Sequence, residues 1–191
     1  MRRGLACLLA TLGLGCGLTY QDQVRPSGLT NYRSLVAPTE TVAGIHTTGL
    51  PTTAAAQNDL RGLVEWPGRR TVRFSFHDAA EGDESWVQRL GWAFEPWPMV
   101  PADDLPWSFF ERPSPEMAFG ARDRIIWYHA QGWTVVMGCV HNRERGQLAA
   151  ALVGMKLLGW NEGQAKGYMD VNGSRWRLTP GLIDFYLSEM P

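Results

Sequence analysis

Two residues that could act together on an oxyanion, Cys139 and Arg145, lie six positions apart in the chain. A cysteine thiolate is a strong nucleophile. An arginine guanidinium carries a planar fork of N–H donors that can hold two oxygens of a tetrahedral oxyanion in a bidentate grip. The Cys-x5-Arg spacing therefore favours attack by the cysteine on a bound oxyanion.

The elements expected around these two residues would form an anion site. Residues 134–137, Thr-Val-Val-Met, are a short apolar run rich in β-branched residues, which is typical of a buried strand. Residues 147–158 are rich in Ala, Leu, Met and Lys, hold no Pro and predict a helix with a mostly buried face. The loop over 138–146 would then end at a helix N-terminus, where free backbone N–H groups and the helix dipole favour an anion. The same setting favours the thiolate over the thiol.

The distribution of cysteines supports a special role for Cys139. The chain has three cysteines, of which Cys7 and Cys16 fall in an N-terminal leader. Cleavage of that leader would leave a single thiol and no possible internal disulfide. The alternative interpretation is a buried structural cysteine at the end of a strand.

The strand, the Cys-x5-Arg loop and the helix together resemble the signature loop of the cysteine-dependent protein tyrosine and dual-specificity phosphatases. The resemblance extends to a turn at 47–51, Thr-Thr-Gly-Leu-Pro, a helix over 54–64 and a strand over 71–76, Thr-Val-Arg-Phe-Ser-Phe. Bacterial and plant-like members open with similar segments. The resemblance implies an α/β fold with a central, mostly parallel sheet flanked by helices. It also implies hydrolysis of a phosphate monoester, on a phosphorylated protein or a small ester, through a cysteinyl-phosphate intermediate and without any cofactor.

The resemblance assigns roles to individual residues. Cys139 would be the nucleophile, and Arg145 would clamp the oxyanion. The general acid would come from the Pro-rich loop before the next expected helix, where we favour Asp104 and keep Asp103 as the alternate. For both carboxylates the alternative is a solvated position without a catalytic role. The remaining residues of the phosphate-binding loop would be Val140, His141, Asn142, Arg143, Glu144 and Gly146.

The loop departs from the family pattern at three positions. Gly138 replaces the usual His before the cysteine, Asn142 replaces a mid-loop Gly, and Gly146 replaces the Ser or Thr after the arginine. The last change removes a hydroxyl group that helps the thiolate leave, so it predicts slow breakdown of the phospho-enzyme. Two other functions stay open. One is a weak or inactive pseudophosphatase that binds a phosphorylated partner, and the other is a rhodanese-like sulfurtransferase.

The sequence holds no competing catalytic pattern. There is no Gly-x-Ser-x-Gly nucleophile elbow and no Walker or dinucleotide-binding glycine pattern. Four histidines show no metal-ligand spacing among themselves or with the cysteine: His46, His77, His129 and His141. We therefore expect no metal site.

Length and composition predict a globular protein with one main domain. Of the 191 residues, 45% are hydrophobic and 19% charged, and the formal net charge of -1 gives no reason to expect nucleic acid as a partner. We divide the chain into a leader (1–16), a tether or irregular lead-in (17–40) and a single phosphatase-like domain (41–191), and we expect a monomer. Further elements are expected as a strand over 90–94 and as helices over 115–131, from 161 and over 179–190.

The N-terminus resembles a bacterial export signal. Arg2 and Arg3 precede an apolar run over 4–15 that is too short to predict a membrane-spanning helix. Residues 12–16, Leu-Gly-Leu-Gly-Cys, resemble a lipoprotein cleavage box in which Cys16 becomes the lipidated first residue. Ordinary secretion with cleavage nearby is the alternative. In both cases we expect an exported bacterial protein, either periplasmic or anchored to the membrane as a lipoprotein.

Overall fold

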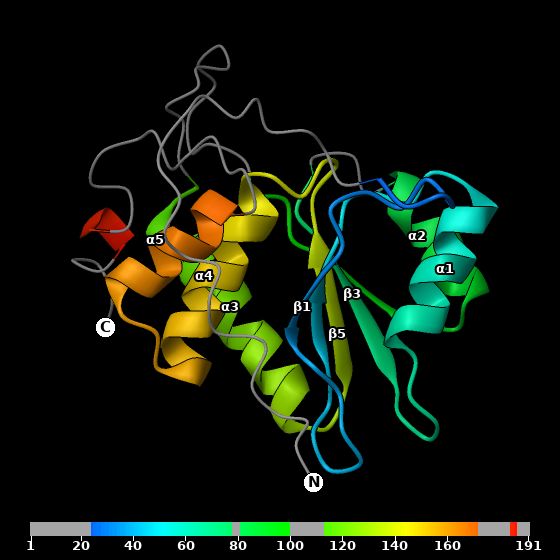
Figure 1. The fold of residues 1–191 in the computed structure, drawn as a ribbon, viewed down its shortest axis with the longest axis horizontal. Coiled ribbons are helices and arrows are strands. Elements are labelled where there is room, and N and C mark those ends of the chain that lie inside the picture. The colour runs from blue at the N-terminus through cyan, green and yellow to red at the C-terminus, as the bar shows by residue number, and fades with distance from the viewer. Residues whose placement is uncertain (1–23, 78–80, 100–112, 172–183, 187–191) are drawn as a thin grey trace, which may run out of the picture.

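The computed structural model describes residues 24–77, 81–99, 113–171 and 184–186. Strands and helices follow one another along this part of the chain (Figure 1). The strands are β1 (Arg33–Val36), β2 (Ile45–Thr47), β3 (Thr71–Ser75), β4 (Ala93–Pro96) and β5 (Thr134–Gly138). The helices are α1 (Ala54–Val64), α2 (Glu81–Arg89), α3 (Pro115–Ala130), α4 (Arg145–Leu158) and α5 (Glu162–Val171).

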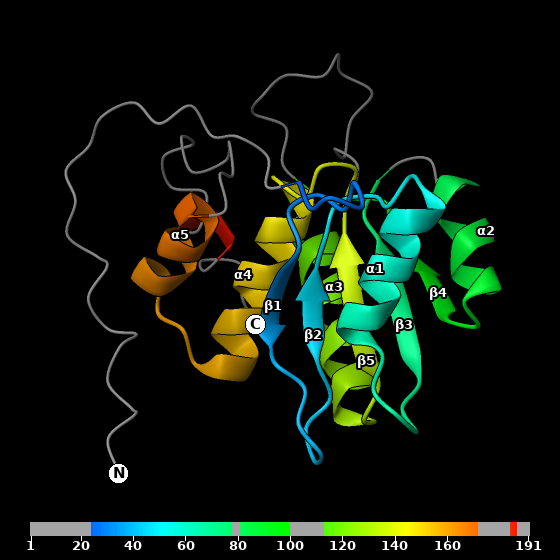
Figure 2. The same cartoon turned by 45° about the vertical axis from the view of Figure 1, so that its right-hand side comes forward.

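The strands form one sheet in the order β1-β2-β5-β3-β4 (Figure 2). β1 runs antiparallel to β2, and all other neighbouring strands are parallel. β5 lies in the centre of the sheet and pairs with β2 on one side and with β3 on the other. The prediction of an α/β fold with a central, mostly parallel sheet flanked by helices is therefore confirmed.

Helices cover both faces of the sheet, which explains why every residue of β3 and β5 is buried. α3 and α4 lie on one face, and α1 and α2 lie on the other (Figure 1). Alternate residues of each strand contribute to the two cores. From the sheet, the α3/α4 core takes Val72, Phe74, Val135, Met137 and the residue after β5, Cys139. The α1/α2 core contains Leu60, Val64, Trp86, Val87 and Val136.

Side-chain caps begin two of the predicted helices where the sequence placed them. The Thr53 hydroxyl accepts a hydrogen bond from the Ala56 N–H at 3.1 Å, so α1 begins at residue 54. The Ser114 hydroxyl accepts from the Met117 N–H at 3.2 Å, and Pro115 occupies the first turn of α3, where no N–H is needed.

β1 lies inside the segment that we expected to be an irregular lead-in. Its Arg33 pairs with Thr47 of β2. The boundary expected at residue 41 is therefore too late, because the sheet already takes its first strand from residues 33–36.

β4 begins at Ala93, so it lies later than the strand that we expected over 90–94. The Leu90 N–H donates to the Trp86 carbonyl at 3.1 Å and so continues the last turn of α2. Gly91 then reverses the chain with a left-handed φ of 72°. The helix end and its turn use the residues that had been assigned to the strand.

Several predicted features lie outside the described residues. They are the leader with Cys7 and Cys16, the loop with Asp103 and Asp104, and most of the helix expected over 179–190. In the described part of the chain, no helix is long and apolar enough to span a membrane.

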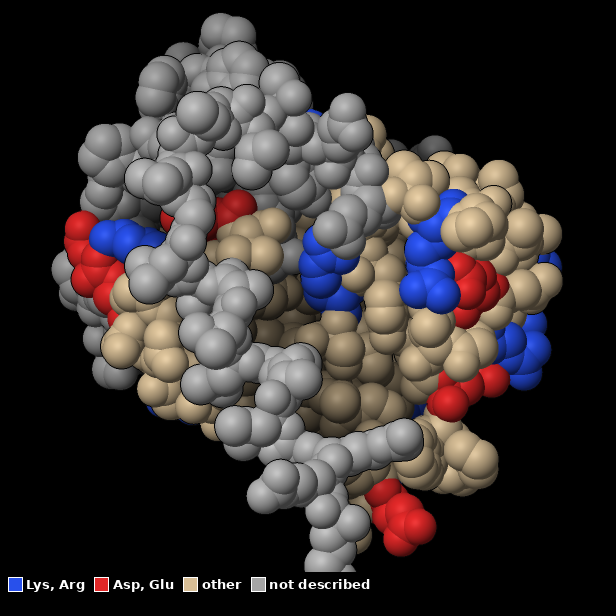
Figure 3. Space-filling model, viewed as in Figure 1, with Lys and Arg blue, Asp and Glu red and all other residues tan. Residues whose placement is uncertain are grey.

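Charged side chains of opposite sign lie next to one another on the surface over α1 (Figure 3). Arg61 Nε lies 2.8 Å from a carboxylate oxygen of Glu65, and Arg25 Nε lies 2.8 Å from one of Asp59. Exposed pairs of this kind stabilise a protein by at most about 1 kcal/mol each. The two cores beside the sheet therefore hold the fold together.

Candidate active site

The carboxyl ends of three parallel strands meet at one edge of the sheet, and Cys139 directly follows the central strand, β5. After β2, the Thr48 N–H donates to the Met137 carbonyl at 3.0 Å. After β3, the Phe76 N–H donates to the Gly138 carbonyl at 2.9 Å. Backbone therefore holds the residues before Cys139 on both sides, at the edge where open α/β sheets bind ligands.

Cys139 is seated by apolar packing. Its thiol is free, only 6% of its surface is exposed, and it belongs to the core between the sheet and helices α3 and α4. The next two residues, Val140 and His141, are exposed. The thiol therefore lies at the boundary between the core and an open loop, which suits a nucleophile with a fixed position.

The loop after Cys139 presents unused backbone donors. Within the described ranges, the N–H groups of Val140, His141 and Asn142 donate no hydrogen bond. Helix α4 then begins at Arg145, and its N-cap residue, Glu144, makes no side-chain capping bond. Loop donors and an uncapped helix N-terminus at one place favour a bound anion.

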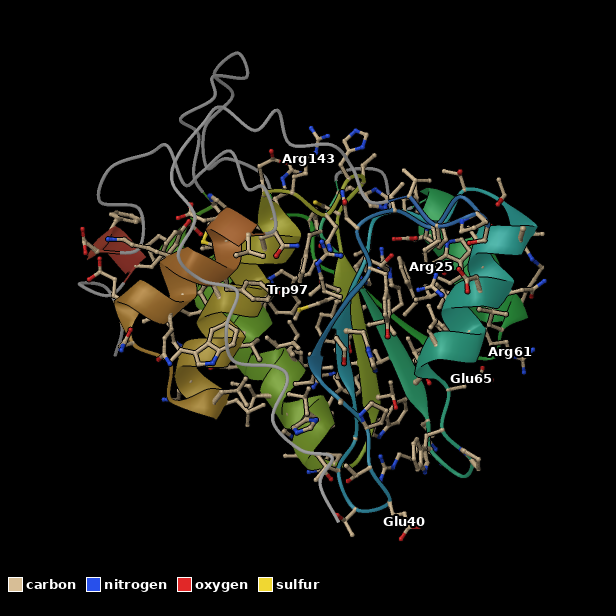
Figure 4. All side chains as sticks on the ribbon, viewed as in Figure 1. Arg25, Glu40, Arg61, Glu65, Trp97 and Arg143 are labelled. Carbon is tan, nitrogen blue, oxygen red and sulfur yellow. The ribbon has the colours of Figure 1, made fainter. Side chains whose placement is uncertain are left out.

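Arg145 extends from the first residue of α4 toward β3. Its Nη1 donates to the Phe76 carbonyl at 3.1 Å, which fixes the direction of the guanidinium. Arg143 is half-buried and lies at the same end of the sheet (Figure 4). The helix starts two residues earlier than we expected, so Arg145 lies in its first turn and not in the loop before it.

Asn142 fixes the shape of the loop through buried hydrogen bonds. It is fully buried and has a left-handed φ of 52°, which Asn tolerates better than most residues. Its Nδ2 donates to the Asn31 carbonyl at 2.9 Å, and Asn31 Nδ2 donates to the His141 carbonyl at 2.7 Å. Gln147 Nε2 donates to the Asn142 carbonyl at 2.8 Å. Two buried amides therefore hold the loop, one from before the sheet and one from α4.

Packing explains the two glycines at the ends of the loop. A β-carbon on Gly138 would lie 1.8 Å from the Thr48 carbonyl oxygen, so no side chain fits there. A β-carbon on Gly146 would lie 2.2 Å from Asn142 Oδ1. The departures from the family pattern at 138 and 146 are therefore built into the local structure.

Solved phosphatase structures are similar to this chain over most of its length. Tk-PTP in its active form gives a TM-score of 0.57 at 12% identity, over 82% of this chain and 94% of that chain. Kinase associated phosphatase, with its catalytic-site cysteine replaced by serine, gives 0.53 at 12% identity, over 77% and 89%. TpbA of P. aeruginosa in complex with phosphotyrosine gives 0.52 at 17% identity, over 88% and 94%. This chain has the fold of the cysteine-dependent phosphatases. No family model and no curated protein matches the sequence.

The predicted loop residues lie at the end of β5, in the loop that follows it and in the first turn of α4. Gly146 and Asn142 are buried, Arg143, Glu144 and Arg145 are half-buried, and Val140 and His141 are exposed. Asp104 and Asp103 lie outside the described residues, so their role as general acid stays a prediction. The catalytic roles of Cys139 and Arg145 stay predictions as well.

Sequence reasoning missed Asn31 and Gln147. Asn31 precedes its loop partner Asn142 by 111 residues, and an asparagine in a polar segment gives no sign of so distant a contact. Gln147 was counted only as the first residue of a helix. The only sequence signal at Asn31 is that asparagine is common in turns, where it adopts a left-handed backbone such as the φ of 48° found here. That signal does not indicate a contact with the loop.

Proposed function

We propose that this protein is a phosphate monoester hydrolase of the protein tyrosine and dual-specificity phosphatase type. The observation that carries the proposal is the loop itself, with a buried thiol at one end and an arginine at the other. Between them lie the N–H groups of Val140, His141 and Asn142, which donate no hydrogen bond within the described residues. The fold supports the proposal because solved structures of phosphatases share it with this chain.

The proposed reaction has two steps. Cys139 Sγ forms a bond to phosphorus in the first step, and that bond breaks in the second. In the first, Cys139 Sγ attacks phosphorus, the S–P bond forms and the P–O bond to the leaving group breaks. Arg145 and the loop N–H groups hold the other phosphoryl oxygens, whose charge they stabilise. Asp104, or Asp103 as the alternate, protonates the leaving oxygen. In the second step a water attacks phosphorus, the same carboxylate accepts its proton, and the S–P bond breaks to release inorganic phosphate and the thiolate.

Gly146 makes the second step the slower one in this proposal. No hydroxyl stands at position 146 to help the Cys139 thiolate leave. We expect the first turnover to release product in a burst about equal to the amount of enzyme, followed by a slower steady rate. Rapid mixing with p-nitrophenyl phosphate measures both phases, and a linear time course without a burst would contradict this step order.

The decisive experiment measures hydrolysis of p-nitrophenyl phosphate by the full chain under reducing conditions with EDTA. Cys139→Ser is the test variant, and Cys7→Ser with Cys16→Ser is the matched control that leaves only Cys139. Activity that is lost in the test variant and retained in the control supports the proposal. If neither protein hydrolyses the ester but vanadate still binds, the pseudophosphatase is favoured. If neither activity nor binding is found, Cys139 is a structural cysteine.

The substrate class can be approached through the structural neighbours. TpbA was crystallised in complex with phosphotyrosine. We propose that this protein also acts on a phosphorylated protein or a small phosphate ester, and that aryl phosphates are the first class to profile. Equal rates on a phosphotyrosine peptide and on a phosphoserine peptide of the same sequence would argue against an aryl preference.

We also propose that the protein is exported and that Cys16 carries a lipid. The support is the sequence of the leader, with Arg2 and Arg3 before an apolar run that ends in Leu-Gly-Leu-Gly-Cys. Labelling with a radioactive fatty acid should mark the wild-type chain and not Cys16→Ala. A labelled Cys16→Ala variant, or an unlabelled cytoplasmic wild type, would contradict this localisation.

A further inference from the structure

A buried ionic cluster lies behind the loop, on the α1/α2 side of the sheet. Arg73, in the middle of β3, has no exposed surface, and its Nη2 lies 3.4 Å from Asp83 Oδ2. The same carboxylate oxygen lies 3.0 Å from His77 Nε2, and Asp83 Oδ1 accepts from the Trp86 indole N–H at 2.9 Å. The proposed reaction uses none of these residues.

The positive end of this cluster faces the residue before the nucleophile. Arg73 Nη1 lies 3.3 Å from the position of a β-carbon on Gly138, whose other near neighbours are backbone atoms of Thr48. Asp83 contacts the guanidinium through Nη2, and none of its atoms is as close to the β-carbon position of Gly138 as Arg73 Nη1 is. Because Gly138 has no side chain, the Thr48 carbonyl oxygen and the Nη1 end of the guanidinium both lie close to the backbone that leads into the loop.

Arg73 is a costly residue to bury at this position. Among the described residues, its Nε and Nη1 have no hydrogen-bond partner. Its guanidinium carbon lies 6.0 Å from the centre of the Trp86 ring, and the ion pair with Asp83 is long. An apolar side chain of similar size would fill such a space in a core at lower free-energy cost. The charge therefore points to a role outside packing.

Asp83 keeps its negative charge in this setting. Burial alone raises the pKa of the Asp83 carboxyl, but the Arg73 guanidinium and the hydrogen bond with His77 outweigh burial and leave the pKa well below its usual value. The carboxylate can therefore hold the guanidinium in a fixed direction at neutral pH.

We propose that Arg73 is a positioning residue that places fixed positive charge behind Gly138 and so stabilises the anion in the loop, with Asp83 orienting it. The charge would act on the thiolate form of Cys139 in the free protein and on the phosphoryl group in the complex, and this assignment rests on the proposed function. Charge in a water-free interior acts over several ångströms with little screening. The Arg73 charge therefore reaches the loop although its side chain lies on the other face of the sheet from the thiol.

The test uses the full chain with Cys7→Ser and Cys16→Ser, so that Cys139 is the only thiol. The rate of its alkylation by iodoacetamide is measured against pH, together with the affinity for inorganic phosphate. Arg73→Met removes the charge at similar length, Arg73→Lys keeps it, and Asp83→Asn removes the opposing charge. Circular dichroism confirms that each variant is folded. Arg73→Met with Asp83→Asn replaces Arg73→Met if the single variant does not fold, since the double variant leaves no unpaired buried charge.

We expect the removal of positive charge and the removal of negative charge to act in opposite directions. Arg73→Met should move the midpoint of the alkylation profile to higher pH and weaken phosphate binding about tenfold. Asp83→Asn should move the midpoint to lower pH or leave it unchanged, and Arg73→Lys should stay close to wild type. The double variant should give a shift of the same sign as Arg73→Met, but smaller.

The proposal is overturned if folded Arg73→Met, or the double variant in its place, keeps the wild-type profile and phosphate affinity. It is also overturned if Arg73→Met and Asp83→Asn shift the profile in the same direction, as loss of a purely structural contact would do. Neither readout needs turnover. Wild-type protein that binds phosphate without hydrolysing the ester would therefore count against the proposed function and leave this inference to be judged on its own results.

Discussion

At the base of the loop, the Asn142 side chain fills the volume that any side chain at position 146 would need. The 2.2 Å approach of a β-carbon on Gly146 to Asn142 Oδ1 is far inside van der Waals contact. Among the described residues, this Oδ1 has no hydrogen-bond partner. The two departures from the family pattern, Asn for Gly at 142 and Gly for a hydroxyl residue at 146, therefore belong together.

This coupling predicts how the two positions respond to substitution. Gly146→Ser alone should lower the free energy of unfolding by about 1–3 kcal/mol through overpacking and should not speed turnover. Adding Asn142→Gly opens the space, suits the left-handed backbone and should recover most of that stability. The double variant should also raise the steady rate of p-nitrophenyl phosphate hydrolysis about tenfold, because a hydroxyl donor again faces the leaving thiolate.

Urea unfolding and rapid-mixing kinetics of the wild type, both single variants and the double variant complete this thermodynamic cycle. Asn142→Gly alone is the control for loss of the bond to Asn31. Losses that simply add in the double variant would show that the two positions are independent.

His46 predicts a dependence of stability on pH. It is 1% exposed, and its Nδ1 shares a hydrogen bond with the Tyr32 hydroxyl at 3.0 Å. Burial lowers the pKa of His46 from 6.5 to about 4. The unfolded chain therefore takes up this proton at higher pH than the folded chain does. The contribution of neutral His46 to the free energy of unfolding is fully present above pH 6.5. It falls by about 3 kcal/mol as the pH drops toward 4.

The measurement compares wild type with His46→Gln, which stays neutral at every pH. Urea unfolding at about pH 7 and about pH 4 gives the difference in free energy of unfolding between the two proteins at each pH. The contributions of all other titratable groups cancel in this difference, because both proteins contain them. We expect wild type to lose roughly 3 kcal/mol more than the variant over this interval. Parallel losses would show that His46 does not titrate on unfolding.

At the scale of the elements, the start of α1 depends on one hydroxyl. Thr53 Oγ1 accepts from the Ala56 N–H and donates to the Ser27 carbonyl at 3.2 Å. Thr53→Ala should lower the free energy of unfolding by about 1 kcal/mol. Thr52→Ala is the matched control, because Thr52 is exposed and lies one position before the cap. Thermal unfolding of both variants measures the difference, and equal losses would argue against the cap.

The elements that could be predicted from sequence are those whose signals are local. α1 and α3 carry a hydroxyl cap at their first turn, and β3 and β5 are continuous runs buried on both faces. The two edge strands, β1 and β4, are only partly buried, so their hydrophobic pattern is weak. β1 lies where an irregular lead-in was expected, and β4 begins later in the chain than the strand expected there. An edge strand that is defined by pairing with a neighbouring strand, and not by its own hydrophobic pattern, is difficult to predict from the sequence.

At the scale of the whole molecule, the candidate site joins parts of the chain that the sequence does not connect. Cys139 and Arg145 could be found because their spacing is local. Asn31 and Arg73 could not, since they reach the loop from more than 60 residues away and only the folded sheet places them there. The sequence alone therefore identifies the candidate reacting groups better than the distant residues that lie beside them.

This long-range support predicts where the chain can be shortened. A chain that begins at residue 41 lacks β1, Asn31 and the fully buried Leu29. We expect it to fold poorly, whereas a chain of residues 24–191 should keep the thermal stability of the full chain. The measurements are thermal unfolding by circular dichroism and the alkylation rate of Cys139, for the full chain, for residues 24–191 and for residues 41–191. A stable 41–191 chain with native alkylation would show that the first strand is dispensable.

The strand order has a consequence for how the protein is made. Among the described strands, β5 is the last to leave the ribosome, yet it occupies the centre of the sheet. Until it arrives, β2 and β3 have no edge in common, and the nascent chain holds only two separate two-stranded pieces. Such non-local pairing raises contact order, slows folding and exposes unpaired strand edges to aggregation. The insertion that closes the sheet also delivers Cys139, so a newly made molecule gains its proposed nucleophile in the same event that completes this sheet.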